Sequence, residues 1–195
     1  MDEKHFWYGK RVLVTGGDGF LASHLIKQLM SHGACVTTTV RHARPLRTLH
    51  LIRENGHRDP DIEHCDLLDF YALRRICDRH QIDTIFHLAA SAIVSDAANS
   101  PMSTIENNVV ATLNILEVAR INHIPRVVIA STDKSYGDHA NDSQERLPYK
   151  ESYALRGLDV YSASKVCADM LAQTYSYQFK LPVVILRPCN MFGPA

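Results

Sequence analysis

With 195 residues, 46% of them hydrophobic, the chain is long enough for one domain with a substantial core. Its 21 Lys and Arg residues balance 21 Asp and Glu residues, so no basic excess favours binding to nucleic acid. Residues 1–10 are charged and aromatic, and no stretch is apolar and long enough to cross a bilayer. We therefore expect no nucleic-acid or membrane partner and a cytoplasmic location.

The chain has five cysteines, which lie far apart and form no Cys-x-x-Cys pair. This pattern predicts reduced thiols, buried as small hydrophobic side chains, rather than a disulfide framework. Eleven histidines are scattered without a His-Glu-x-x-His arrangement, so we expect no metal site. The cysteines are Cys35, Cys65, Cys77, Cys167 and Cys189.

Apolar runs of strand length alternate along the chain with longer segments of helical pattern. Residues 11–15 form the first run and residues 21–31 the first helical segment. Near-continuous β-branched runs at 12–14 and 127–129 indicate strands buried on both faces of a parallel sheet. The other segments are 34–40, 84–88, 109–122, 126–130, 161–179 and 183–186. The alternation predicts an α/β fold with a doubly wound parallel sheet and helices on both faces.

A glycine-rich turn joins the first strand to the first helix. Residues 16–22 read Gly-Gly-Asp-Gly-Phe-Leu-Ala and contain the pattern G-x-G-x-x-A, with Ala22 in place of a third glycine. Glycines at Gly16 and Gly19 allow a tight turn and a close approach of the backbone to a pyrophosphate, while the helix N-terminus attracts the anion. In this strand-turn-helix context the pattern predicts a dinucleotide site rather than a mere tight turn.

The end of the second strand bears on the choice of cofactor. An Asp or Glu about 20 residues after the glycines would hold the ribose 2′-hydroxyl of NAD, but residues 37–44 contain no acid. Arg41 and Arg44 lie there instead, either to bind the 2′-phosphate of NADP or as solvated loop residues. The pattern predicts NAD(P)+ and favours NADP slightly.

Tyr161 and Lys165 are four residues apart at the start of a predicted helix, so their side chains share one face. An ammonium group near a phenol favours the phenolate, so we expect Lys165 to lower the pKa of Tyr161 from about 10 and make it a base for a hydroxyl proton.

A polar segment at 131–137 follows the strand predicted at 126–130. Ligands bind beyond the carboxyl ends of parallel strands, so Thr132 is placed to donate to a substrate oxygen. The alternative is that the segment is a turn or a helix cap. The polar stretch at 137–159 is longer than an ordinary connection and is predicted to be a functional loop near a site.

Six motifs run through the chain from Lys10 to Pro194. They are T-G-G-D-G-F (15–20), H-L-A-A (87–90), N-N-V-V-A-T (107–112), S-T-D-K-S-Y-G (131–137), Y-S-A-S-K (161–165) and R-P-C-N-M-F-G-P (187–194). In this order and spacing they resemble the extended short-chain dehydrogenase/reductase, or NAD-dependent epimerase/dehydratase, family. The resemblance implies a Rossmann fold and NAD(P)-dependent chemistry.

The resemblance also implies roles for the matching residues. Asp66 and Leu67 would flank the adenine, and Thr132, Tyr161 and Lys165 would perform hydride and proton transfer. Motifs and resemblance together give these expected cofactor-binding residues: Gly16, Gly19, Phe20, Leu21, Arg41, Asp66, Leu67, Leu88, Ala89, Ala90, Asn108, Tyr161, Lys165 and Pro188. The expected substrate-binding residues are Ser91, Thr132 and Asn190.

Asp133 and Lys134, directly after Thr132, resemble the NDP-sugar 4,6-dehydratases, above all those of the CDP-glucose type, whereas sugar epimerases tend to carry small or neutral residues there. Such an enzyme oxidises a nucleotide-sugar at C4, eliminates water across C5 and C6, and returns hydride to C6. Asp133 would protonate the departing C6 hydroxyl. Lys134 would take the C5 proton or, as a cation, stabilise the enolate.

The family's substrate-binding lobe follows the segment where this chain ends and is largely absent from it. We therefore expect residues 1–195 to be a dinucleotide-binding domain, the N-terminal part of a longer enzyme or a naturally short relative. A 4-epimerase and a non-catalytic dinucleotide-sensing or interaction module are the alternatives. The segments at 109–122 and 161–179 match two helices that form a four-helix dimer interface in the family, which implies a homodimer, although core packing explains their apolar faces equally well.

Overall fold

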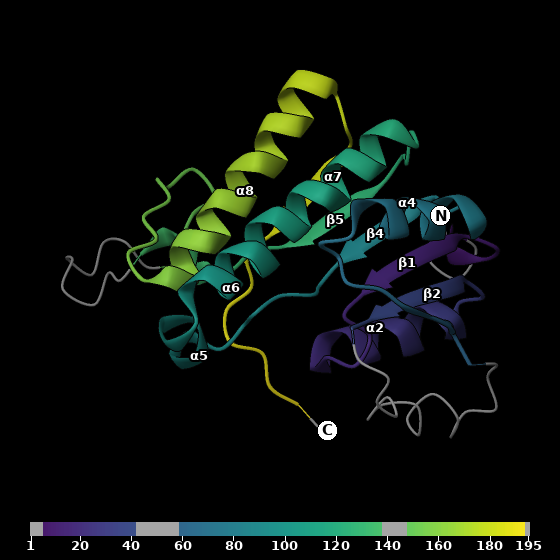
Figure 1. Ribbon diagram of the computed structural model, residues 1–195, viewed down its shortest axis with the longest axis horizontal. Helices are drawn as coiled ribbons and strands as arrows, with labels where there is room; N and C mark the ends of the chain where they lie inside the picture. Colours follow the sequence, from purple (N-terminus) through teal and green to yellow (C-terminus); the bar gives the residue numbers. More distant parts are fainter. Residues whose placement is uncertain (1–5, 42–58, 138–147, 194–195) are drawn as a thin grey trace.

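The computed structural model describes residues 6–41, 59–137 and 148–193. Six strands form one sheet in the order β3-β2-β1-β4-β5-β6, and every neighbouring pair is parallel. This confirms the predicted doubly wound sheet (Figure 1). The strands are β1 (Arg11–Thr15), β2 (Cys35–Val40), β3 (Asp61–His64), β4 (Thr84–His87), β5 (Val127–Ala130) and β6 (Val183–Leu186).

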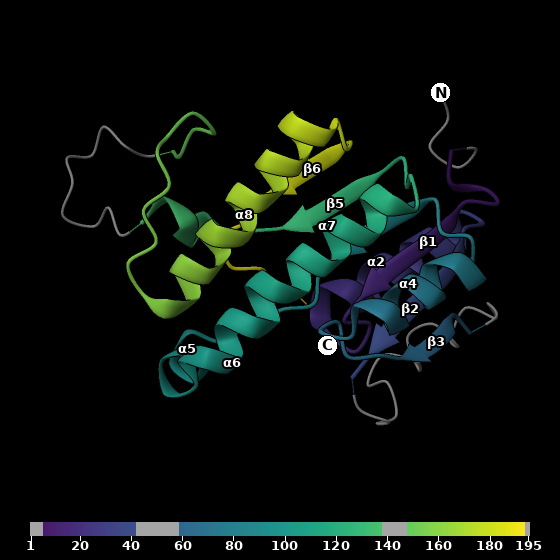
Figure 2. The same cartoon turned by 45° about the horizontal axis from the view of Figure 1, so that its top comes forward.

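Helices cover both faces of the sheet, as predicted. α2 packs on one face, and α4, α7 and α8 lie side by side on the other (Figures 1 and 2). The helices are α2 (Phe20–Ser31), α4 (Phe70–Arg79), α5 (Val94–Asn99), α6 (Pro101–Ile105), α7 (Ala111–Ile121) and α8 (Val160–Phe179), with a π-helical turn η1 (Glu106–Val110) and a 3₁₀ turn η2 (Asp133–Tyr136).

The core consists of two apolar layers, one on each face of the sheet. On the α2 side, Val12, Val14 and Ile26 are fully buried. On the other side, Leu13 of β1 packs in a larger cluster with residues of α4, α7 and α8. The period-two alternation of β1 therefore sends apolar side chains to both faces, which explains why this short strand occupies the middle of the sheet.

Four elements have no counterpart among the predicted segments: β3, α4, α5 and α6. β3 reads Asp-Ile-Glu-His, lies at the sheet edge and is only partly buried, so it lacks the apolar run that marks an interior strand. The helix predicted at 109–122 is the second half of a longer helical stretch that begins at Pro101 and contains the π turn. The other predicted boundaries are correct to within one residue.

All five cysteines are free, but Cys35, Cys167 and Cys189 are exposed. The prediction of buried thiols is therefore right for Cys65 and Cys77 and wrong for the other three. In the described ranges no three His, Cys, Asp or Glu residues are grouped so that they could hold a metal ion. No helix in the same ranges has the length and apolar character needed to cross a membrane.

Candidate active site

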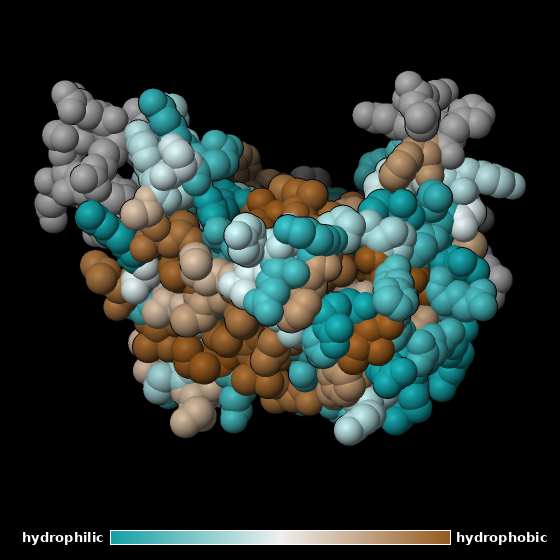
Figure 3. Space-filling model, turned by 90° about the horizontal axis from the view of Figure 1, so that it is seen from above, coloured by the Kyte–Doolittle hydropathy of each residue, from teal (hydrophilic) through white to brown (hydrophobic). Residues whose placement is uncertain are grey.

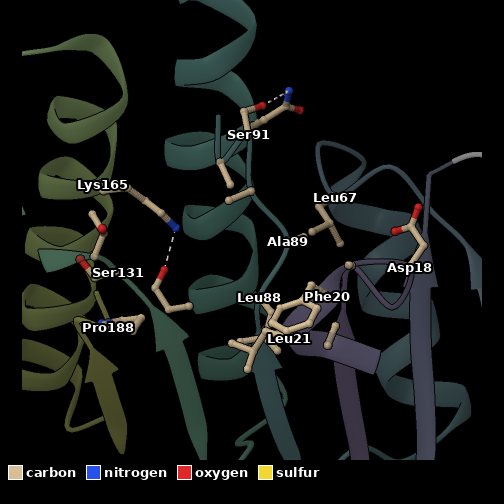
Figure 4. A pocket seen from close by; sticks show the side chains of 18 of the residues that line it. Asp18, Phe20, Leu21, Leu67, Leu88, Ala89, Ser91, Ser131, Lys165 and Pro188 are labelled. Carbon is tan, nitrogen blue, oxygen red and sulfur yellow. Dashed lines mark hydrogen bonds between the residues drawn. The ribbon is translucent and has the colours of Figure 1, made fainter. Parts of the chain in front are cut away.

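The carboxyl ends of all six strands border one cavity of about 570 Å³. Parallel pairing places these ends at one edge of the sheet, where the chain leaves each strand and opens a crevice. The glycine loop and the ends of β2 and β3 form one end of this cavity, and Ser131, Lys165 and Pro188 form the other (Figure 4). Residues predicted for the cofactor and those predicted for catalysis therefore share one space.

The glycine loop has the geometry that its sequence predicts. Gly16 has φ of +73°, and a Cβ there would approach the Ala89 backbone to 3.0 Å. Gly19 is the N-cap of α2, which has no side-chain cap and no acidic residue in its first turn. The first N–H groups and the positive end of the helix dipole are thus left to bind an anion at the cavity. These features fit the pyrophosphate of a dinucleotide.

The residues predicted to contact the adenosine part of the cofactor lie at the ends of β2 and β3. Val40 of β2 and Arg41 immediately after it, and Asp66 and Leu67 after β3, line the cavity. The Arg41 guanidinium crosses to the π turn and donates a hydrogen bond of 3.0 Å to Asn107. Arg44, the second candidate for a 2′-phosphate, lies outside the described residues.

A buried chain of hydrogen bonds ties the cavity floor together through His87. The Thr15 hydroxyl accepts from the backbone N–H groups of Leu88 and Ala89, each at 3.1 Å, so its own proton goes to His87 Nδ1 at 2.9 Å. Thr112 donates to the Asn108 carbonyl at 2.6 Å and therefore accepts from His87 Nε2 at 3.1 Å. The donors and acceptors match only for a neutral ring protonated on Nε2. Burial, and secondarily the charge of Lys165, lowers the pKa of His87 to about 3.

The π turn brings two consecutive asparagines to the same loop. Asn108 accepts from the Ser91 N–H at 2.8 Å and donates to the Ser91 carbonyl at 3.1 Å and to Ser164 at 2.9 Å. Asn107 donates to the Ser91 hydroxyl at 3.2 Å, a contact drawn in Figure 4. Predicted as a cofactor ligand, Asn108 is 1% exposed and does not line the cavity. It lies behind Ser91, which lines the cavity, and joins it by hydrogen bonds to Ser164 of α8.

Tyr161, Lys165 and Thr132 meet at the far end of the cavity. Asp159 caps α8 by accepting from the Ser162 N–H at 2.9 Å, which starts the helix so that Tyr161 lies in its first turn. The Tyr161 hydroxyl is hydrogen-bonded to Thr132. One turn further on, Lys165 Nζ donates to the Ala130 carbonyl at 2.6 Å. Three elements, α8, β5 and the turn after β5, thus contribute to one polar cluster.

The expected lowering of the Tyr161 pKa is wrong for this arrangement. Burial raises the pKa of Tyr161 above its usual 10, and the charges of Asp133 and Asp159 add to that effect, while the hydrogen bond between Tyr161 and Thr132 opposes it. Lys165 does not lower it because its ammonium is directed to the Ala130 carbonyl rather than to the phenol. Burial lowers the pKa of Lys165 itself to about 8, although the Asp169 carboxylate favours the ammonium.

The turn after β5 is both a helix cap and part of the site. The Thr132 hydroxyl caps η2 by accepting from the Lys134 N–H at 3.4 Å, and it donates to Asp133 Oδ1 at 3.2 Å. Lys134 lines the cavity but Asp133 does not. Of the predicted loop at 137–159, residues 138–147 lie outside the described residues; Arg156, which is described, binds the Ser135 carbonyl at 2.7 Å.

Most of the predicted site residues line the cavity, and several lining residues escaped prediction. The predicted lining residues are Gly16, Gly19, Phe20, Leu21, Arg41, Asp66, Leu67, Leu88, Ala89, Ala90, Ser91, Thr132, Lys134, Tyr161, Lys165, Pro188 and Asn190. Unpredicted residues include Thr39, Cys65, Ala92, Asn107 and Ser131. Thr39, Cys65 and Ser131 lie at or next to the carboxyl ends of β2, β3 and β5, which is the signal that could have found them, whereas Asn107 lies in η1 and adjoins the predicted Asn108.

A Rossmann-type sheet, a glycine loop at the start of α2 and a Thr-Tyr-Lys cluster at the same sheet edge form an arrangement that is typical of dinucleotide-binding domains. Residues 12–195 match the model of the NAD dependent epimerase/dehydratase family. The chain belongs to this family.

Its relatives include both enzyme types in the family's description. CDP-glucose 4,6-dehydratase from Salmonella typhimurium is 34% identical, over 93% of this chain and 50% of the relative. UDP-N-acetylglucosamine 4-epimerase from Methanobrevibacter ruminantium, solved with UDP-N-acetylmuramic acid, has 29% identity and a TM-score of 0.83, covering 96% of this chain and 57% of its own. UDP-glucose 4-epimerase from Brucella ovis, solved with NAD, has 27% identity and a TM-score of 0.79, covering 92% and 51%. The chain spans about half the length of curated relatives that it matches.

The neutral His87 makes stability depend on pH. Its folded pKa is about 3 against an ordinary value of 6.5, so between these values the unfolded chain binds a proton that the folded chain refuses. Stability is then complete above pH 6.5 and falls as the pH falls, by about 3 kcal/mol at pH 4. Urea unfolding should show the advantage of wild type over His87→Gln shrinking by this amount from pH 7 to pH 4.

The exposed His123 supplies the matched control, since His123→Asn removes a histidine without touching the buried chain. Its stability relative to wild type should be the same at both pH values. Parallel pH curves for wild type and His87→Gln would refute the assignment of a neutral buried ring.

Proposed function

We propose that the chain is the cofactor-binding and catalytic part of an NAD(P)-dependent nucleotide-sugar 4,6-dehydratase. The observation that carries the proposal is the shared cavity, in which Thr132, Tyr161, Lys165 and Lys134 line one end and the glycine loop the other. The identity to the CDP-glucose and dTDP-glucose 4,6-dehydratases supports it. A dinucleotide bound at the loop supplies the hydride acceptor for sugar C4 and the hydride later returned to C6.

The residues of this chain supply the proton transfers. Tyr161 removes the proton from the C4 hydroxyl while Thr132, to which it is hydrogen-bonded, orients that oxygen. The resulting 4-ketone acidifies the C5 hydrogen. Lys134, which lines the cavity, takes that proton or stabilises the enolate. Asp133 protonates the departing C6 hydroxyl, and reaches the cavity by giving up its bond from Thr132.

A panel of NDP-hexoses with NAD or NADP tests the reaction directly. The expected product is a 4-keto-6-deoxy sugar, lighter than its substrate by one water and identified by mass spectrometry and NMR. Tyr161→Phe should lower its rate by about 10² to 10⁴, the usual contribution of a general base. Asp133→Asn should leave the C4 oxidation, followed at 340 nm, and lose the elimination of water.

Tyr153→Phe is the matched control, because this residue contacts the Tyr136 ring near η2 and does not line the cavity. It should retain turnover. Formation of a C4 epimer without loss of water would replace dehydration by 4-epimerisation, the activity of the structural relatives. Dinucleotide binding without either product would favour the non-catalytic module.

For the cofactor, we propose a preference for NADP over NAD, although the solved relatives include complexes with NAD. The support is Arg41, which lines the cavity where the acid expected for NAD is missing. Arg41→Ala should weaken NADP binding about tenfold, the loss of a charge-assisted hydrogen bond, and leave NAD binding unchanged in calorimetry. Arg74→Ala, on α4 away from the cavity, removes the same charge and should change neither. Equal losses for both cofactors would refute the preference.

We also propose a homodimer through the outer faces of η1, α7 and α8. Exposed apolar side chains gather on these elements, at Val110, Leu113, Met170 and Phe179, with Ile105 at the adjoining end of α6. In Figure 3 hydrophobic residues form a broad band on this part of the molecule. Large exposed apolar patches mark interaction sites more often than free surface.

Sedimentation equilibrium measures this assembly. The chain should have twice the monomer mass, and Met170→Glu combined with Leu113→Glu should reduce it to the monomer because two charges would be buried in the interface. Tyr71→Glu places the same charge on an exposed aromatic residue of α4 and should leave the dimer intact. A monomeric wild type would contradict the proposal.

A further inference from the structure

A buried ion pair lies directly behind the candidate active site. Asp169, on α8, is fully buried and accepts from Arg187 Nε at 2.8 Å and from Arg187 Nη2 at 3.0 Å. This is the two-pronged geometry that a guanidinium makes with a carboxylate. Gln173 donates to the same carboxylate at 2.7 Å, and Ser131 is hydrogen-bonded to it. Neither charged residue lines the cavity.

The Arg187 guanidinium continues from the pair to the turn after β5. Nη1 donates to the Tyr136 hydroxyl at 2.9 Å and to the Glu151 carbonyl at 3.3 Å, and the guanidinium lies 5.2 Å from the centre of the Tyr136 ring. Tyr136 is the last residue of η2 and stacks on Tyr149. The arginine therefore contacts the turn at its far end, while Thr132 caps its beginning.

Each partner of the pair is adjacent to a wall of the cavity. Asp169 follows Lys165 by one helical turn, Arg187 immediately precedes Pro188, and Ser131 immediately precedes Thr132. Figure 4 shows Lys165, Ser131 and Pro188 together at one end of the cavity. A displacement of the ion pair would therefore also displace the neighbouring cavity residues Lys165, Pro188 and Ser131.

We propose that the Asp169–Arg187 pair is a positioning element that fixes the turn bearing Thr132, Asp133 and Lys134 against the helix bearing Tyr161 and Lys165. The proposal rests on the proposed dehydratase function and adds two residues to it. Asp169 also holds a negative charge one turn from the Lys165 ammonium. Tyr161 on its own helix and His87 on β4 also lie near Lys165, and Lys134 lines the same end of the cavity.

Arg187→Lys tests the positioning role because it keeps the charge and removes the fork. With the NDP-hexose and the cofactor, NAD or NADP, that turn over fastest in the panel, the rate of cofactor reduction at 340 nm in a single turnover should fall about tenfold or more, since displacements of about 1 Å at reacting groups cost up to 10² in rate. The dissociation constant of that cofactor should stay within about twofold. Tyr136→Phe, which removes just the hydroxyl that Arg187 contacts, should lower the rate in the same direction and covers the case in which Arg187→Lys does not fold.

Arg126 offers a matched control at the opposite end of the sheet. It forms an ion pair of 2.9 Å with Asp83 and donates a hydrogen bond of 2.9 Å to Thr84, where β4 and β5 begin. Arg126→Lys should lower the melting temperature without changing the rate of cofactor reduction. If Arg187→Lys and Tyr136→Phe likewise retain the wild-type rate, the pair is purely structural and the proposal fails.

A titration of Lys165 gives a second readout that requires no turnover. In chain labelled with ¹³C at the lysine ε carbons, the Lys165 resonance is the one missing from Lys165→Ala, and its wild-type midpoint should lie near 8. Asp169→Asn keeps the shape of that side chain and removes its negative charge, which favours the Lys165 ammonium, so the midpoint should move lower. Arg126→Lys should leave it in place. A chain that reduces neither NAD nor NADP with any NDP-hexose of the panel fails the proposed function. The midpoint still tests the positioning role in that case, and an unmoved midpoint overturns it.

Discussion

Parallel pairing of six strands is the constraint on which the rest of the structure depends. Because the six strands are parallel, the chain leaves all of them at one edge, and most of the residues that line the cavity lie within a few residues of a strand end; Asn107 from η1 and Tyr161 and Lys165 from α8 complete it. The apolar residues of β1 that pack on both faces hold this edge in place. The site is therefore a consequence of the core rather than an addition to it.

Buried polar side chains behind the cavity fix the positions of the loops that line it, which nondirectional apolar packing does not do. A series of hydrogen bonds joins β1, β4 and α7 through Thr15, His87 and Thr112, and every hydrogen bond in this series has a defined donor and acceptor. Asn108 joins the loop after β4 to α8 in a similar way. These groups are buried, so an unpaired donor or acceptor would cost about 1–3 kcal/mol. That cost ties the loops to a single arrangement.

The sequence was sufficient for the parts of the fold whose cause is local. The β-branched runs of β1 and β5, the glycines before α2 and the Tyr-x-x-x-Lys pair are each explained by their own residues. β3 was not predictable in this way, because a polar edge strand owes its conformation to pairing with β2. The family resemblance predicts Asn108 as a cofactor ligand. No pattern in the sequence distinguishes a side chain that lines the cavity from one that is buried behind the lining residues.

The expectation of a lowered pKa at Tyr161 is wrong because it rests on sequence spacing alone. Four residues on a helix place Tyr161 and Lys165 on one face, but they do not decide which acceptor the ammonium takes. In the folded chain the Ala130 carbonyl is that acceptor. The carbonyl group of Ala130, at the end of β5, thus competes with the Tyr161 phenol for the Lys165 ammonium.

The proton balance at this end of the cavity then follows from burial. Burial opposes both the Tyr161 phenolate and the Lys165 ammonium, and Asp133 and Asp159 oppose the phenolate further. The hydrogen bond between Tyr161 and Thr132 acts in the other direction but does not outweigh them. A working base at Tyr161 needs positive charge brought toward its oxygen. Among the described residues, Lys165 and Lys134 are the cations that line that end of the cavity, and the placement of both depends on the turn after β5 and the helix that follows it.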